Sequence, residues 1–133
     1  MADSFTPVVR ALVAATLLLA TATVMLVTAS RVQAAGALAV GACGAFGEAY
    51  DFATPDQASR SAMAKCKGNG CRVVATVAHA CASLAIDYNN ACGPHGWGKA
   101  PKLGRAQNEA LRGCYKSGGK ECVIRTFFCD AKG

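Results

Sequence analysis

The feature that most constrains this chain is a unit of four cysteines that occurs twice. All eight cysteines follow residue 42, and the string ACG opens a similar stretch at residues 42–44 and again at 91–93. Each stretch continues with an aromatic residue beside glycine, an alanine-spaced helical pattern, a glycine turn and a cysteine that precedes an apolar run. This order predicts two copies of one structural unit that are crosslinked by disulfides.

The N-terminal segment has the organisation of a signal peptide. Arg10 precedes an apolar run over residues 11–30, and Ala34 follows as a small residue of the kind that a signal peptidase reads. We therefore expect cleavage after Ala34, with residues 1–34 as signal peptide and residues 35–133 as a single disulfide-rich domain. The run is also near the length that spans a bilayer, so an uncleaved anchor is the alternative. Both interpretations predict an exported domain, periplasmic or extracellular.

The number and placement of the cysteines predict disulfides. An even count at this density in an exported chain indicates crosslinks, each contributing about 2–4 kcal/mol by restricting the unfolded chain. Two expected bonds staple a helix end to the following strand: Cys66–Cys71 and Cys114–Cys122. The twofold pattern further permits bonds between equivalent positions of the two halves, with the pairing of these four cysteines left open: Cys43–Cys92 and Cys81–Cys129.

Each repeat, at about residues 36–80 and 82–129, is expected to run strand, strand, helix, strand. Short apolar stretches open both repeats, and the β-branched runs that begin at the third and seventh cysteines are predicted to be buried strands. Phe46 and Trp97 occupy equivalent places beside glycine and are expected in the core. The prediction is one α+β domain of about six strands and two helices with pseudo-twofold symmetry.

The two helices are expected to begin differently. Thr54 is a predicted N-cap with proline after it and Gln57 placed as in a capping box, and this helix should reach about Lys67. Lys102 replaces the threonine in the second copy, so that cap should be weaker. Small alanines on the buried lines imply that both helices lie close against a sheet.

These residues resemble a known family. The strings ACG, FGEA, ASRSAMAKC, GCRVV, ASLAI and AQNEALRGC are similar, over about residues 36–129, to the bacterial family called domain of unknown function 4189. The resemblance implies a secreted or periplasmic domain with no established activity, and it carries over no catalytic residue. Cys43 and Cys92 look like additions to the cysteine set that is commoner in that family.

The chain is basic, with a formal net charge of +6. Most of the excess lies in residues 81–133, where several cations surround the second expected helix. The expected binding face consists of Lys99, Lys102, Arg105, Arg112 and Lys116. Such a face can hold phosphate or carboxylate groups, and an ordinary solvated helix face is the alternative. The expected partner is a protein or an anionic envelope component; nucleic acid is not expected, and membrane contact only through the N-terminal segment.

No cofactor or metal site is predicted, because the chain has no C-x-x-C pair of the kind that zinc sites use. Candidate catalytic residues are the carboxylates Glu48, Asp51 and Asp87, together with His79 and Ser83. No nucleophile-elbow or phosphate-loop motif surrounds them. The favoured hypothesis is therefore a non-enzymatic exported domain that binds a protein or envelope component, for example as an inhibitor or protective factor. The alternatives are a small periplasmic hydrolase and a structural protein of the envelope.

Overall fold

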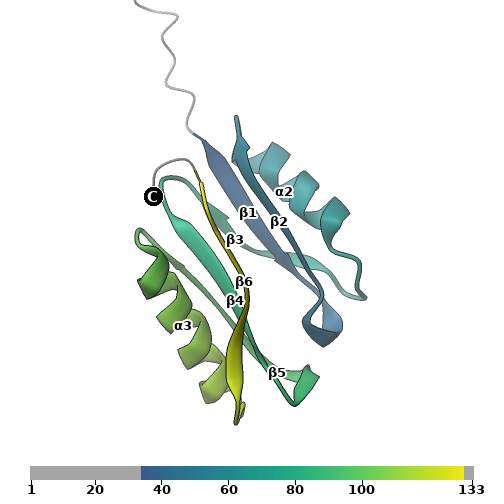
Figure 1. The fold of residues 1–133 in the computed structure, drawn as a ribbon. Coiled ribbons are helices and arrows are strands. Elements are labelled where there is room, and N and C mark those ends of the chain that lie inside the picture. The colour runs from purple at the N-terminus through teal and green to yellow at the C-terminus, as the bar shows by residue number, and fades with distance from the viewer. Residues whose placement is uncertain (1–33, 131–133) are drawn as a thin grey trace, which may run out of the picture. The chain divides into compact units, whose positions relative to one another are not determined.

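The computed structural model describes residues 34–130, so the predicted signal peptide lies outside the described residues apart from Ala34. These residues form six strands, two α-helices and one turn of 3-10 helix (Figure 1). In chain order the elements are β1 (Ala35–Val40), η1 (Ala42–Gly44), β2 (Phe46–Phe52), α2 (Pro55–Lys65), β3 (Arg72–Val77), β4 (Cys81–Asp87), β5 (Asn90–Ala100), α3 (Leu103–Lys116) and β6 (Cys122–Cys129).

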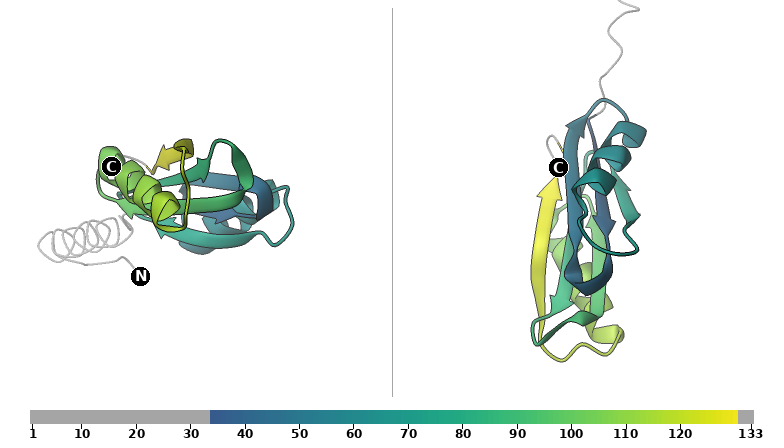
Figure 2. Two further views of the ribbon diagram at one scale, coloured as in Figure 1. Left: turned by 90° about the horizontal axis from the view of Figure 1, so that it is seen from below. Right: turned by 90° about the vertical axis from the view of Figure 1, so that its right-hand side faces the viewer.

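The strands form two antiparallel sheets of identical topology. One sheet has the order β2-β1-β3 and the other has the order β5-β4-β6, so each repeat builds a sheet with its first strand in the centre. The sheets face each other, with α2 and α3 on the outer faces, as Figures 1 and 2 show. The predicted α+β architecture of two strand-strand-helix-strand units is thereby confirmed.

Alternation along the central strands separates the large core residues from the small ones. On β1, Leu38 and Val40 pack between the sheets, whereas Ala37 and Ala39, which alternate with them, lie beneath α2. On β4, Leu84 and Ile86 take the same positions between the sheets, and Ala85 lies beneath α3. A strand buried on both faces has little room beneath a helix, so small residues there let the helix approach.

Glycines bring each helix against an edge strand. A Cβ atom at Gly47 would collide with the backbone of α2 at Ala62, and one at Gly98 would collide with the backbone of α3 at Ala106. These two glycines are at matching places in the repeat, next to Phe46 and Trp97. The close helix packing that the alanines predict therefore also requires glycine on the facing strand.

The helix ends agree with the expected caps. The Thr54 hydroxyl accepts a hydrogen bond from the Gln57 backbone N–H at 3.2 Å, and Pro55 is the first helical residue. Helix α2 ends at Lys65, slightly before the expected Lys67. Lys102 precedes α3 without a side-chain cap, as its chemistry predicts. Within residues 34–130, no helix has the length and apolar character needed to cross a membrane.

The expectation that Trp97 is a core residue is wrong. Trp97 pairs with Leu84 and so faces the other sheet, but its side chain is 44% exposed. It lies on β5, an edge strand, where the opposing edge strand β3 covers it only in part. Phe46, its counterpart, is half-buried, with the Arg125 guanidinium 5.8 Å from its ring centre. Strand β5 is continuous from Asn90 to Ala100, because the chain reverses just before it, at Tyr88 and Asn89.

Candidate functional site

All eight cysteines form disulfides. The bonds are Cys43–Cys92, Cys66–Cys71, Cys81–Cys129 and Cys114–Cys122, the same four pairs that the twofold pattern permits. The expected reason for one of them is wrong: Cys81 and Cys129 are cross-strand neighbours on β4 and β6, both in the second sheet, and do not join equivalent positions. Only Cys43–Cys92 links the two sheets. Four disulfides are typical of proteins that fold in an oxidising compartment.

Glu48 holds the edges of two strands together. Its carboxylate accepts a hydrogen bond of 2.6 Å from the Thr126 hydroxyl on β6, across the gap between the sheets. Its backbone carbonyl accepts a 2.9 Å hydrogen bond from the Lys65 ammonium, which covers the free edge of β2. Glu48 is therefore occupied at a sheet edge by contacts that stabilise the fold.

Asp87 ends β4 and organises the loops beside it. Its carboxylate accepts hydrogen bonds from the backbone N–H groups of Asn89, at 3.0 Å, and Lys120, at 2.7 Å. The Lys120 N–H is the main cause that holds the pKa of the Asp87 carboxyl below its ordinary value of 3.8, against the opposing effect of burial. A carboxylate stabilised in its charged form in this way is a poor proton donor and a weak base.

His79 lies away from Asp87, and the Ser83 hydroxyl is engaged inside the second sheet, where it and Glu48 contact different groups of Thr126. His79 sits in the turn before β4, and its backbone N–H donates to Asp130 at 2.9 Å. Since Asp87 is at the other end of β4, about 20 Å of strand separates the two sites. Ser83 is fully buried, and its hydroxyl donates to the Thr126 carbonyl at 3.2 Å. The candidate catalytic residues are therefore not brought together.

Asp51 has an unusual backbone conformation, and Asp130 accepts hydrogen bonds from backbone groups. Asp51 lies near the end of β2 with a φ of 61°, in the left-handed region where aspartate is tolerated better than most residues. Asp130 is fully buried, and its carboxylate accepts hydrogen bonds from the N–H groups of His79 and Ala80. Asp130 thus fixes the turn that joins the two halves. It had no signal in the sequence, because it is a single acid 50 residues from its partners.

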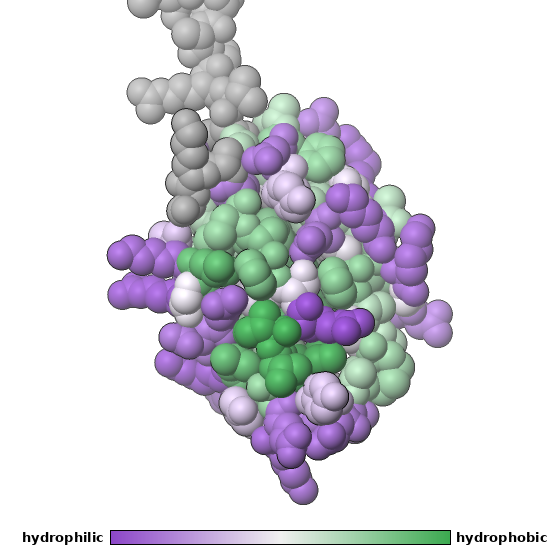
Figure 3. All heavy atoms as spheres, viewed as in Figure 1, coloured by the Kyte–Doolittle hydropathy of each residue, from purple (hydrophilic) through white to green (hydrophobic). Residues whose placement is uncertain are grey.

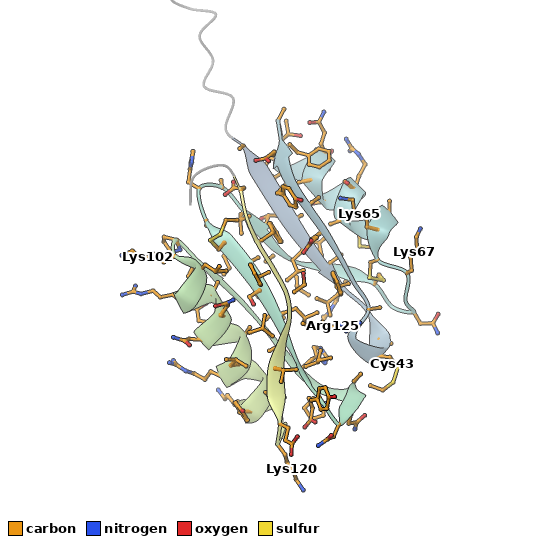
Figure 4. All side chains as sticks on the ribbon, viewed as in Figure 1. Cys43, Lys65, Lys67, Lys102, Lys120 and Arg125 are labelled. Carbon is orange, nitrogen blue, oxygen red and sulfur yellow. A yellow bond between two sulfur atoms is a disulfide. The ribbon has the colours of Figure 1, made fainter. Side chains whose placement is uncertain are left out.

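The predicted basic face is divided by the structure. Lys99 turns away from α3: its ammonium donates to the Thr76 carbonyl on β3 at 2.7 Å. The other four side chains are exposed along α3 and have no hydrogen bond or ion pair within residues 34–130. We call this set the α3 basic face: Lys102, Arg105, Arg112 and Lys116. Lys102 marks one end of it in Figure 4, and Figure 3 shows hydrophilic side chains along the edge where α3 lies.

The acid nearest to this face in the helix is already engaged. Glu109 accepts a hydrogen bond at 3.2 Å from the Lys99 backbone N–H, on the free edge of β5. The opposite side of α3 is fixed by the buried residues Ala106, Ala110 and Cys114, the last of which is crosslinked to Cys122 on β6. The α3 basic face is therefore a row of unpaired cations on a rigidly held helix.

One cleft was not anticipated from the sequence. A cavity of about 250 Å³ lies between β3 and β5, and its lining includes Arg72, Val74 and His95. Neither Arg72 nor His95 belongs to a sequence motif that indicates a binding site. The two belong to different repeats and line one cavity only because the sheets stack, so no local spacing could reveal the cleft. We call it the β3–β5 cleft.

Comparison with known families identifies the chain. It belongs to the family described as a domain of unknown function (DUF4189), whose sequence model matches residues 35–129. The match covers both repeats and all four disulfides. Neither the curated proteins nor the solved structures contain a significant match to this chain.

Proposed function

We propose that this protein is a small exported, non-enzymatic domain that captures an anionic protein or envelope component through the α3 basic face. The observation that carries the proposal is the row of four exposed cations on α3 without an ion pair or hydrogen bond in residues 34–130. Capture of an envelope enzyme, as an inhibitor or protective factor, is one concrete form of this function.

The arrangement of charge favours binding over a merely solvated surface. By contrast with α3, Arg60 on α2 is paired with Asp56 one turn away. Unpaired cations on one helix face add their potentials and raise the local concentration of anionic groups. Because α3 is held by its disulfide and buried alanines, little backbone entropy is lost when a partner docks.

Export is supported by the disulfides together with the N-terminal pattern. Four disulfides persist in oxidising compartments and are rare in the cytosol. The segment before Ala34 carries the order of a signal peptide. A domain outside the cytoplasm meets anionic lipid head groups, polymers and envelope proteins, which suit a cationic helix.

The non-enzymatic part of the proposal is supported by the separate positions of the candidate catalytic groups. Glu48 is bonded to Thr126, and Asp87 is bonded to backbone N–H groups at the far end of β4 from His79. Each of these groups has a role in holding the fold. General acid–base chemistry instead needs two such groups within reach of one substrate.

Charge reversal tests the proposal. The variant Arg105→Glu/Arg112→Glu/Lys116→Glu, immobilised in its disulfide-bonded form, should lose capture from an envelope extract and binding to phosphatidylglycerol vesicles by about tenfold or more. The matched control, Arg60→Glu/Lys67→Glu/Lys120→Glu, makes the same change in net charge away from α3. The control variant should lose much less of its capture and vesicle binding. Equal losses in both variants, or none in either, would refute the α3 basic face.

A further inference from the structure

We infer that the β3–β5 cleft binds a small ring-bearing oxyanion, such as a sugar that carries a phosphate or carboxylate group. This site is separate from the α3 basic face, since its lining comes from β3, β5, the end of β1 and the segments that follow β1 and precede β3. Its volume of about 250 Å³ is at the small end of ligand pockets, which suits a monosaccharide-sized molecule.

The charge of the lining selects an anion. Among residues 34–130, Arg72 and His95 are the ionisable residues that line the cleft, and no acid of this part of the chain lines it. The Arg72 guanidinium has no hydrogen bond or ion pair within residues 34–130, so its N–H groups are free to make a two-pronged contact with an oxyanion. The Nδ1 atom of His95 lies 3.3 Å from the Gly93 carbonyl, which orients the ring and leaves Nε2 for a ligand.

Disulfides hold the walls of the cleft in place. The loop with Asn69 and Gly70 is closed by Cys66–Cys71, and a Cβ atom at Gly41 would come within 2.8 Å of the Cys71 sulfur. The Ala42 N–H donates to the Asn69 carbonyl at 2.9 Å. Little ordering is therefore needed when a ligand enters.

The opposite wall is also crosslinked. Cys92 lies three residues before His95 on β5 and is bonded to Cys43 in η1. Cys43 directly follows Gly41 and Ala42, which line the cleft. Figure 4 labels Cys43 at this end of the domain. The only disulfide between the two sheets thus sets the width of the cleft between them.

Trp97 gives the site a platform for a ring. It follows His95 by two residues on β5, so both side chains leave the same face of the strand. Its side chain is 44% exposed despite facing the other sheet. An exposed indole on the same strand face as His95 suits a ligand whose charged group contacts Arg72 while its ring stacks on Trp97.

Titration of the disulfide-bonded protein by ¹H–¹⁵N NMR tests the inference. The probes are glucose 6-phosphate, glucuronate and glucose as the neutral analogue. We expect saturable shifts at residues 40–42, 69–74 and 92–97 with at least one charged sugar and not with glucose. Which charged sugar binds identifies the oxyanion as phosphate or carboxylate. No saturable shift with any probe would overturn the inference.

Two variants locate the binding. Arg72→Gln removes the guanidinium of an exposed residue and should weaken binding about tenfold, whereas Arg105→Gln on α3 should leave it unchanged. Trp97→Ala should also weaken binding of the charged sugar, because it removes the surface on which the ring stacks. Loss of binding in Arg105→Gln with retention in Arg72→Gln would place the sugar on the α3 basic face and overturn the cleft site. The dispersion of the NMR spectrum shows whether each variant is folded.

Discussion

The two halves of the domain share their interior and differ at their surface. Both place large apolar residues between the sheets, glycine and alanine beneath a helix, and a disulfide at the helix end. Both sheets also have a register shift on their last strand, at Val74 and at Arg125. The repeated positions are therefore those that packing requires.

The two halves differ mainly at solvent-exposed positions. On β3 and β6, Arg72 stands where the other half has Val123, and Thr76 stands where it has Phe127. Helix α2 has a paired arginine, whereas α3 has unpaired cations. A common scaffold thus carries a cleft lined by Arg72 at one edge and a basic helix on the second sheet. The surface charge of the two halves therefore differs although their packing repeats.

Removal of a disulfide should cause the largest loss of stability, and the loss should depend on which disulfide is removed. Cys43→Ala/Cys92→Ala opens a loop with a sequence separation of 49, and the chain-entropy model predicts a loss of about 4 kcal/mol. Cys66→Ala/Cys71→Ala opens a loop with a separation of only 5 and should cost about 2 kcal/mol in the same model. Urea unfolding of both variants measures the order, and a reversed order would contradict the role of Cys43–Cys92 as the tie between the sheets.

Glycine substitution tests whether the two helices pack equivalently. Gly47→Ala and Gly98→Ala each place a methyl group against helix backbone, and each should lose about 3 kcal/mol. Gly104→Ala is the control, because nothing lies within 4 Å of that position on α3, and it should be neutral or stabilising. Free energies of unfolding compare the three variants. A large loss at only one of the two strand glycines would break the equivalence.

The helix caps should respond in opposite directions. Thr54→Ala removes the hydroxyl that accepts from Gln57 and should destabilise the protein by about 1 kcal/mol. Lys102→Ser supplies a capping hydroxyl where α3 has none and should stabilise it by a smaller amount of the same kind. Thermal unfolding measures the stability of both variants. A loss of stability in Lys102→Ser would show that the uncapped start of α3 has a structural reason.

Lowering the pH should locally destabilise the second half of the domain around Asp87. Because its folded-state pKa is lowered, Asp87 contributes stability above its ordinary value of 3.8 and loses that contribution as pH falls through the lowered pKa. The amide of Lys120 should therefore lose hydrogen-exchange protection in acid, whereas that of Ala42, bonded to a carbonyl in the first half, should not. In Asp87→Asn the acid-dependent change should disappear. Its persistence would assign the change to another group.

Much of the fold was predictable because it repeats local patterns. Alanine spacing, the Thr54 cap and the cysteines at helix ends each act within a few residues, so they appear directly in the chain. The prediction for Trp97 was wrong because burial depends on what covers an edge strand, and an aromatic beside glycine carries no information about that cover. The β3–β5 cleft could not be predicted for the same reason, because it depends on which strands face each other across the two sheets.

The sequence by itself determined the repeat, the order of elements in each half and the presence of a crosslinked core, since these rest on periodicity and on short-range pairing. Only the tertiary structure decided which side chains meet. Stacking of the two sheets brings Arg72 to His95 and Glu48 to Thr126, and it turns Lys99 away from α3. Such contacts join residues tens of positions apart, and the physical reason they form is the burial of the large apolar faces of both sheets against each other.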